Sequence, residues 1–507
     1  MTAAATDMVD EAWVPVIDHG EDRVVNLRSA LKEAHLLDGL GSTLLPVERE
    51  AMLRFLESLT AAVLRGSDPD DLDGARIPED AVDRFFAEHA GLFDLRDPDR
   101  PFMQEWHAPM PDPGELTSKY SPVEQLHLRV PGGSSASWGI TTEMRDATAP
   151  GVLATLLMVA WFHGKPSNAA GATVYRPTSG AKRSPISGAP SGAAKDTVFH
   201  LIGRTLAETL LQNVPASWLE SPYGPAWLDQ DAEPSPADIA QVGTLWRCTW
   251  TPNRALVVWD GDRATRYTVG LTQRMIPNVG PIDGLSKQSD VWKANAKAMP
   301  TGDYCRVRRP DPSKPGASFP VHASPNLDSA EGFEEWYKSE LSDSLTQWVD
   351  QPRALRPTRR SEVGFHHEEG DTYGNRSVST WTVIPLARLT VAGEAAGALR
   401  VVTSRVTYLV GKVSLALKRG LAASSTPTAA IEVKRLVYAM LDEPVLDAVA
   451  QASDGVVVDD QRICAHMNDR AVRAFVDATE AMLTPATAPA IHRSRAVYAR
   501  LARKDSK

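Results

Sequence analysis

Apolar residues recur at helical intervals in several parts of the chain. Residues 46–66 read PVEREAMLRFLESLTAAVLRG, where intervals of three and four predict a helix with one buried face. That face consists of Leu53, Leu56, Leu59 and Val63. Pro46 at the start and Gly66 after the end are typical of helix boundaries. The apolar run 151–162 predicts a further buried helix, too short to cross a bilayer.

Other stretches alternate between apolar and polar residues, as strands do. WVPVID, residues 13–18, contains a proline and predicts an edge strand, with EDRVVNL as its hairpin partner. Residues 243–271 alternate well enough to predict a hairpin or a meander. The rest of the region between 240 and 385 is irregular and rich in proline.

The C-terminal part of the chain has a different pattern. An amphipathic helix of about thirty residues is predicted by intervals of three and four. Its apolar positions are Leu399, Val402, Val406, Leu409 and Val413. Three more helical segments follow, near 428–451, 466–483 and 487–504, and their short connections predict an up-and-down bundle. We therefore expect an α+β fold, with a large, mixed and irregular N-terminal domain (1–384) and a C-terminal four-helix bundle (385–507).

Composition and charge narrow the class of protein. The chain has 507 residues, 43% hydrophobic and 23% charged, as in globular proteins of more than one domain. A net charge of −10 argues against tight, autonomous nucleic-acid binding. From Arg400 onward, however, 16 Lys and Arg stand against 11 Asp and Glu, so the basic end is the C-terminal one. Three scattered cysteines and an acidic N-terminus without a signal pattern indicate a cytoplasmic protein.

Catalytic motifs are missing from the sequence: it has no P-loop, no GxSxG elbow and no HExxH. The best metal candidate is FHHEEGD, residues 365–371, with His366, His367, Glu368, Glu369 and Asp371. Consecutive side chains point in different directions and rarely converge on one ion, so we interpret this stretch as a solvated loop. We expect no catalytic residue, no metal and no cofactor.

Four segments carry a resemblance to a known family. They are, in chain order, DEAWVPVIDHGEDRVVNLRSAL, GLFDLRDPDRPFMQ, SPVEQL and LAETLLQNV. Together with the predicted bundle they resemble the CasA family, the large subunit of the type I-E CRISPR surveillance complex Cascade. In this family the PFMQ segment is scaffold, so we expect Phe102 and Met103 to be packed in the core.

The resemblance implies a non-catalytic DNA-recognition protein. Members of the family read the protospacer-adjacent motif of double-stranded target DNA, mainly from the minor groove, and open the duplex beside it. They thereby start R-loop formation with the CRISPR RNA, contact other Cascade subunits and provide the docking surface for a nuclease-helicase. Reading only a short motif while RNA pairing reads the rest is the general logic of RNA-guided recognition.

The same resemblance suggests which residues contact DNA. GGSSASWGI occupies the place of the first recognition loop, with Trp138 and Gly139; Trp138 either stacks on DNA or anchors the loop. TSGAKRS occupies the place of the glycine-rich loop, with Gly180, Lys182 and Arg183. It has fewer glycines than typical relatives, so the preferred motif is open, and a plain surface loop is the alternative.

Two further elements complete the predicted interface. Asn375 falls where the family places a wedge glutamine in a short hairpin, with Arg376 beside it; a simple hairpin turn is the alternative. On the first C-terminal helix Arg405, Lys412 and Arg419 are seven residues apart, and Arg493, Arg500 and Lys504 form a similar stripe on the last helix. Such stripes either track phosphates or are solvated faces. The cysteine cluster of many relatives is missing here, so no metal is inherited.

Two other classes of protein remain open from the residues alone. One is a metal-dependent nuclease that uses the HHEEGD carboxylates. The other is a helical scaffold that binds only protein.

Overall fold

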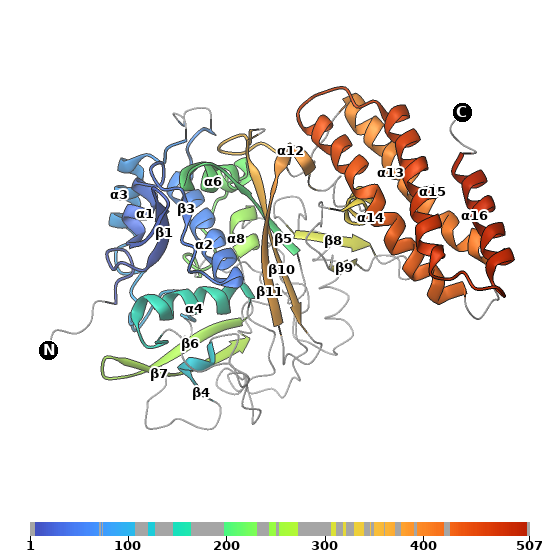
Figure 1. The fold of residues 1–507 in the computed structure, drawn as a ribbon. Coiled ribbons are helices and arrows are strands. Elements are labelled where there is room, and N and C mark those ends of the chain that lie inside the picture. Colours follow the sequence, from blue (N-terminus) through green and yellow to red (C-terminus); the bar gives the residue numbers. More distant parts are fainter. Residues whose placement is uncertain are drawn as a thin grey trace, which may run out of the picture. The chain divides into compact units, whose positions relative to one another are not determined.

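Figure 1 shows the fold in a computed structural model. The structure describes residues 6–69, 72, 75–106, 120–126, 146–163, 197–230, 243–249, 253–271, 306–310, 318–320, 329–338, 345, 349–358, 360–370, 377–389, 393–419 and 426–503. The chain forms two compact units. The first unit comprises Met1–Val307, Pro320–His322 and Trp348–Val383, and the second comprises Arg308–Phe319, Ala323–Gln347 and Ile384–Lys507.

A small antiparallel sheet opens the first unit. Strand β1 (Val14–Asp18) pairs with β2 (Glu21–Val25), which confirms the predicted hairpin, and also with the two-residue strand β3 (Gly39–Leu40). The expectation of an edge strand is wrong, because β1 lies between its two partners. Pro15 has no N–H to donate. It lies at the end of the pairing between β1 and β3, where its carbonyl accepts from the amide of Gly41, directly after β3, so the missing donor interrupts no other hydrogen bond of that pair.

Helix α2 (Pro46–Leu64) is the central helix of this unit. Its predicted apolar face is confirmed as buried, but the opposite face is buried as well, including Glu50, Arg54 and Glu57. The helices that contact it are α3 (Glu79–Glu88), α4 (Pro150–His163), α6 (Leu206–Gln212), α7 (Ala216–Leu219) and α8 (Gly243–Thr249). The short helix α1 (Leu27–Lys32) packs on α3 instead. A helix covered on all sides must pair its charged side chains internally.

The PFMQ segment lies in the aromatic core, as predicted. Phe102 and Met103 are each 1% exposed. The ring of Phe102 lies 5.4–6.4 Å, centroid to centroid, from four other aromatic rings, those of Trp13, Phe55, Phe93 and Trp227. Gln104 is also buried: its amide nitrogen donates to the carbonyl of Leu95, and its oxygen accepts from the backbone N–H of Val257. The segment therefore joins the core to a strand 150 residues further on, and it is architecture.

That strand belongs to the second sheet, whose hairpin confirms the prediction for residues 253–271 but not for residues 243–249, which are helical. β6 (Asn253–Asp260) pairs with β7 (Arg263–Leu271), and the short strand β4 (Ser121–Pro122) adds to β7. The helix α8 before the hairpin was not predicted. Helix α4, which precedes the hairpin in the sequence, packs on β6 (Figure 1).

A third, five-stranded sheet carries the segments that matter for function. Its order is β11 (Ser377–Pro385), β10 (Glu362–Gly370), β5 (Thr197–Ile202), β8 (Arg306–Pro310) and β9 (Ser318–Pro320). β5 pairs antiparallel with β10, so that His366 lies opposite Val198. α2 also contacts β10. β10 is therefore an interior strand.

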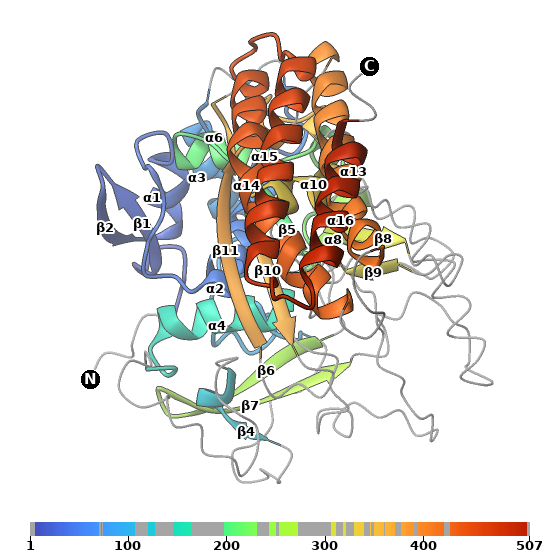
Figure 2. The same cartoon turned by 45° about the vertical axis from the view of Figure 1, so that its right-hand side comes forward.

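The second unit is helical. α13 (Gly393–Lys418), α14 (Thr426–Ser453), α15 (Asp460–Glu480) and α16 (Ala488–Arg503) contact one another, and Figure 2 shows them side by side. The five predicted apolar positions of α13 are all buried. The short helix α12 (Leu386–Leu389) contacts α14. Mixed helices and small antiparallel sheets make the chain an α+β protein.

The division of the chain differs from the expected one in one respect. Residues 308–319 and 323–347 group with the second unit, although we assigned them to the N-terminal domain. The reason is α10 (Ala330–Lys338), an amphipathic helix that packs on α13 and α14 with Phe333 and Trp336 buried. The carboxylate of Glu334 accepts from the hydroxyl groups of Thr407 and Tyr438. Of the helices described, none has the length and apolar character needed to cross a bilayer.

Candidate functional site

Most of the predicted DNA-contacting residues fall on segments that the structure does not describe. These residues are Trp138, Gly139, Gly180, Lys182, Arg183, Asn375 and Arg376. Their flanking elements are described. α4 ends at His163, directly before residues 164–196, and β5 begins directly after them. β10 and β11 are neighbours in one sheet and are joined by residues 371–376.

The basic stripe predicted on α13 does not hold for all three residues. Arg405 is buried, 8% exposed: its Nε donates to Oδ1 of Asn468 at 2.7 Å, and its NH2 donates to the carbonyl of Ala502. Arg405 is therefore an internal residue of the second unit, with its guanidinium used inside that unit. Lys412 is half-buried, with its ammonium 4.6 Å from the ring centroid of Tyr408, whereas Arg419 is exposed.

The stripe predicted on the last helix has two described members. Arg493 and Arg500 are exposed, and Lys504 lies outside the described residues. The residues between them that face inward, Ser494 and Tyr498, are fully buried. Exposed cations are thus available directly after α13, at Arg419, and on α16, at Arg493 and Arg500.

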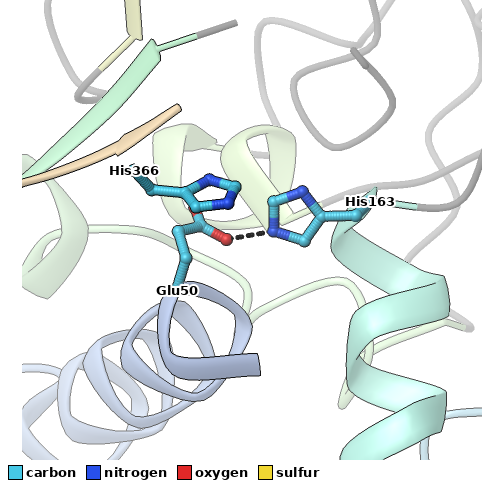
Figure 3. A group of neighbouring side chains, drawn as sticks. All are labelled: Glu50, His163 and His366. Atoms are coloured by element: carbon cyan, nitrogen blue, oxygen red, sulfur yellow. Dashed lines mark hydrogen bonds and ion pairs between the residues drawn. The ribbon is translucent and has the colours of Figure 1, made fainter. Parts of the chain in front are cut away.

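The described residues bring a different group together, in the interior of the first unit. Glu50 of α2, His163 at the end of α4 and His366 of β10 converge, as Figure 3 shows. One ligand-type atom of each lies within 4.8 Å of those of the other two. Nε2 of His163 is hydrogen-bonded to Oε2 of Glu50, and the two imidazole rings meet edge to face, 5.2 Å between centroids.

Three more charged or titratable groups surround this trio. Arg54 lies one turn after Glu50, and its Nε is 2.5 Å from Oε1 of Glu50. His200, on β5, places Nδ1 2.7 Å from Oε1 of Glu57 and Nε2 3.7 Å from Oε1 of Glu50. All six residues are buried. We call them the histidine–carboxylate cluster: Glu50, Arg54, Glu57, His163, His200 and His366.

The cluster sets unusual protonation equilibria. Burial of His366, helped by the positive charge of His163, lowers its pKa to about 3, so the ring is neutral near pH 7. Burial also disfavours charge on His200, but the charge of Glu57, its hydrogen bond to the ring and the nearby carboxylate of Glu50 raise the pKa of His200 to about 9. Burial opposes ionisation of Glu50, yet Arg54 and His163 hold the pKa of its carboxyl well below the usual range.

The interpretation of FHHEEGD as a solvated loop is therefore wrong for its described part. Residues 362–370 form β10, and His366 is 1% exposed. The physical reason is that β10 pairs with its neighbours in the sheet and contacts α2, while the ring of His366 lies against that of His163. Asp371 lies outside the described residues. Glu50, His163 and His200 were not predicted as site residues, and the available signal was the charged i, i+4, i+7 set of α2 within an otherwise apolar helix.

Comparison with known proteins shows the family. The family described as "CRISPR-associated protein Cse1 (CRISPR_cse1)" matches residues 7–356. The chain belongs to this family, and the resemblance to CasA, which is the same family, is confirmed. No curated protein matches the chain.

Solved structures share the fold over the whole chain. Thermobifida fusca Cse1 is 18% identical, with a TM-score of 0.66 over 100% of this chain and 99% of that one. Thermus thermophilus CasA (Cse1) is 17% identical, with a TM-score of 0.60 over 99% of both chains. A chain of a structure titled "CRISPR RNA-guided surveillance complex" is 16% identical, with a TM-score of 0.66 over 97% of this chain and 99% of that one.

Proposed function

We propose that this protein is the non-catalytic large subunit of a CRISPR RNA-guided surveillance complex. In this role it recognises the protospacer-adjacent motif in double-stranded DNA, helps to open the duplex for R-loop formation and recruits a nuclease-helicase. The observation that carries the proposal is membership of the Cse1 family, together with a fold that matches a surveillance-complex chain end to end. The other Cascade subunits and the CRISPR RNA are its expected partners.

Recognition of the flanking motif is assigned to residues 164–196, whose two flanking elements are buried, and to Trp138 and Gly139. Residues 164–196, with Gly180, Lys182 and Arg183, run from the buried end of α4 to the buried strand β5. Glycine permits close approach of backbone to the minor groove, and the two cations can neutralise phosphates. Trp138 and Gly139 would supply a stacking contact.

Duplex opening is assigned to the connection between β10 and β11. Two adjacent strands of nine residues each support the six residues 371–376, which include Asn375 and Arg376. An amide side chain can hydrogen-bond to bases as a glutamine does, and a neighbouring arginine can hold a phosphate. A wedge must resist the restacking of bases, and a strand pair within a five-stranded sheet gives it that support.

Phosphate contacts on the second unit are assigned to Lys412, Arg419 and the exposed arginines of α16. Arg405 is withdrawn from this set because its guanidinium is used inside the unit. Of the HHEEGD residues that the nuclease alternative would use, His366 is 1% exposed, which does not favour access of a phosphodiester. The side chains of Glu368, Glu369 and Asp371 lie outside the described part of the chain.

The test is R-loop formation by the assembled complex on duplexes that differ only in the flanking motif. Lys182→Ala combined with Arg183→Ala, and separately Trp138→Ala and Asn375→Ala, should each weaken R-loop formation by about 1–3 kcal/mol in apparent affinity. Arg84→Ala, an exposed arginine of α3, is the matched control and should have no effect. Unchanged R-loop formation in all three variants would remove the loop assignments, and failure of the chain to assemble with the other subunits would remove the proposal itself.

A further inference from the structure

The histidine–carboxylate cluster has a composition that DNA recognition does not require. Three imidazoles, two carboxylates and a guanidinium from four separate elements meet in the core of the first unit. Burying such groups costs free energy unless each is paired or bound to an ion. Among the described residues, Glu50, His163 and His366 form a group in which three possible metal ligands lie within 4.8 Å of one another.

We propose that Glu50, His163 and His366 bind a zinc ion, with Nε2 of His200 as the fourth ligand. Two histidines and a carboxylate are an established ligand set for this ion, and four ligands are the rule for a closed structural site. The absence of any exposed ligand fits a structural ion rather than a catalytic one, because no position is open to substrate.

Distances in the cluster are close to those that a zinc ion needs. Zinc binds imidazole nitrogen at about 2.0–2.1 Å and carboxylate oxygen at about 2.0–2.2 Å, so two ligands of a tetrahedral ion are about 3.4 Å apart. The observed limit of 4.8 Å, which holds for Glu50, His163 and His366 but does not include His200, requires these ligand atoms to approach one another by about 1.4 Å at most. Nε2 of His163 and Oε2 of Glu50, which are hydrogen-bonded, would instead move apart to admit the ion. The hydrogen bond between His163 and Glu50 already directs Nε2 and Oε2 toward a common point, where an ion would replace the proton.

His200 has the arrangement of a metal-binding histidine. Its Nδ1 is held by a carboxylate, Oε1 of Glu57 at 2.7 Å, which fixes the ring and leaves Nε2 as the ligand atom. That Nε2 has no hydrogen-bond partner among the described residues, is fully buried and lies 3.7 Å from Oε1 of Glu50. A buried nitrogen aimed into a group of ligands is what an ion would satisfy.

Arg54 is the group that most strongly competes with an ion. It binds Oε1 of Glu50 and stacks its guanidinium 5.4 Å from the ring centroid of Phe162. Because it uses Oε1, the ligand oxygen of Glu50 must be Oε2, the atom that faces His163. Arg54 then orients the ligating carboxylate as an outer partner, and Glu57 offsets part of the positive charge.

Such an ion would link α4, β5 and β10, the elements that flank the segments assigned to DNA recognition. His163 directly precedes residues 164–196, His200 lies on the strand that follows them, and His366 lies on the strand that leads to residues 371–376. This consequence rests on the proposed function, whereas the ion site does not. The test therefore uses the isolated chain without nucleic acid, so that its failure is separate from failure of R-loop formation.

The experiment measures zinc in the untagged, full-length chain after expression with zinc, brief treatment with a chelator and gel filtration. We expect about one ion per chain by mass spectrometry of the metal. His366→Gln and His163→Gln should each lower zinc affinity by about tenfold or more, and Glu57→Gln should do so to a lesser degree. His466→Gln, which changes an exposed histidine of α15, is the matched control and should retain the ion.

A second measurement does not depend on the folding of any variant. The wild-type chain loaded with Co²⁺ should show the intense visible absorption bands of a four-coordinate site, and added Zn²⁺ should remove them. A wild-type chain that holds far less than one zinc per molecule, or that gives no such cobalt spectrum, would overturn the proposal. Equal loss of zinc in His466→Gln and His366→Gln would overturn it as well.

Discussion

Two buried arginines, Arg54 of the first unit and Arg405 of the second, are neutralised in different ways. Arg54 of α2 is paired with the charged carboxylate of Glu50. Arg405 of α13 donates instead to neutral acceptors, the amide of Asn468 and the carbonyl of Ala502. Ala502 lies in the last turn of α16, where backbone carbonyls have no partner within the helix and carry partial negative charge. The partner of Arg54 is another charge, whereas one partner of Arg405 is a helix end; the buried Arg353 of the first unit likewise donates to the carbonyl of Gln212, at the end of α6.

The cause lies in how each helix is covered. α2 is surrounded on all sides, so its charged residues pair with one another, as Arg54 does with Glu50, or with groups that other elements bring to them. α13 keeps an exposed side, and its residues seven apart change environment gradually: Arg405 is buried, Lys412 half-buried and Arg419 exposed. A straight helix turns by about 20° per heptad relative to a repeat of seven, so a stripe of this spacing leaves the interior along the helix.

The strongest way to break this comparison is to remove the charge partner in the first unit. Glu50→Ala leaves Arg54 buried without its carboxylate, which should lower the free energy of unfolding by about 3–5 kcal/mol. Urea unfolding followed by tryptophan fluorescence, with a chelator present so that no bound ion contributes, measures the change. Glu443→Ala, which breaks the more exposed ion pair with Arg470, should cost about 1 kcal/mol or less. Similar losses in the two variants would show that the buried pair has no special weight.

The sequence predicted the buried helix faces of both units but not the long-range pairings of their buried charged residues. The periodicity of α2 and α13 predicted their buried apolar faces, because those faces depend only on local spacing. The pairing of Glu50 with His163 joins residues 113 positions apart, and no local pattern encodes it. His366 is buried because β10 contacts α2 and its ring lies against that of His163, long-range packing that the FHHEEGD residues themselves do not encode. Arg405 was misplaced for a similar reason, since its acceptors come from α15 and α16.

Two glycines show how much more closely β10 is packed than the exposed side of α13. A Cβ at Gly364 of β10 would lie 2.3 Å from Cζ2 of Trp381, whereas a Cβ at Gly411 of α13 would meet nothing within 4 Å. Gly364→Ala should therefore destabilise the chain by about 1–3 kcal/mol through overpacking. Gly411→Ala should stabilise it by about 0.5–1 kcal/mol, because alanine restricts the unfolded chain and favours the helix. Urea unfolding of both variants measures the two signs, and equal signs would contradict the packing difference.

The smallest effect concerns the basic residues of α13 and rests on the proposed DNA contact. Lys412→Ala and Arg419→Ala, in the assembled complex, should each flatten the dependence of log K on log salt by about one unit, equally for all flanking motifs, because each removes one phosphate contact. Arg405→Ala should leave that slope unchanged although it lowers stability by about 1–3 kcal/mol, since it leaves a buried amide and a carbonyl without their donor. Filter binding at several salt concentrations separates the two effects. If the slope of log K against log salt changed with Arg405→Ala but not with Arg419→Ala, the guanidinium of Arg405 would leave the interior when the complex binds DNA. The difference between Arg54 and Arg405 would then hold only for the free chain.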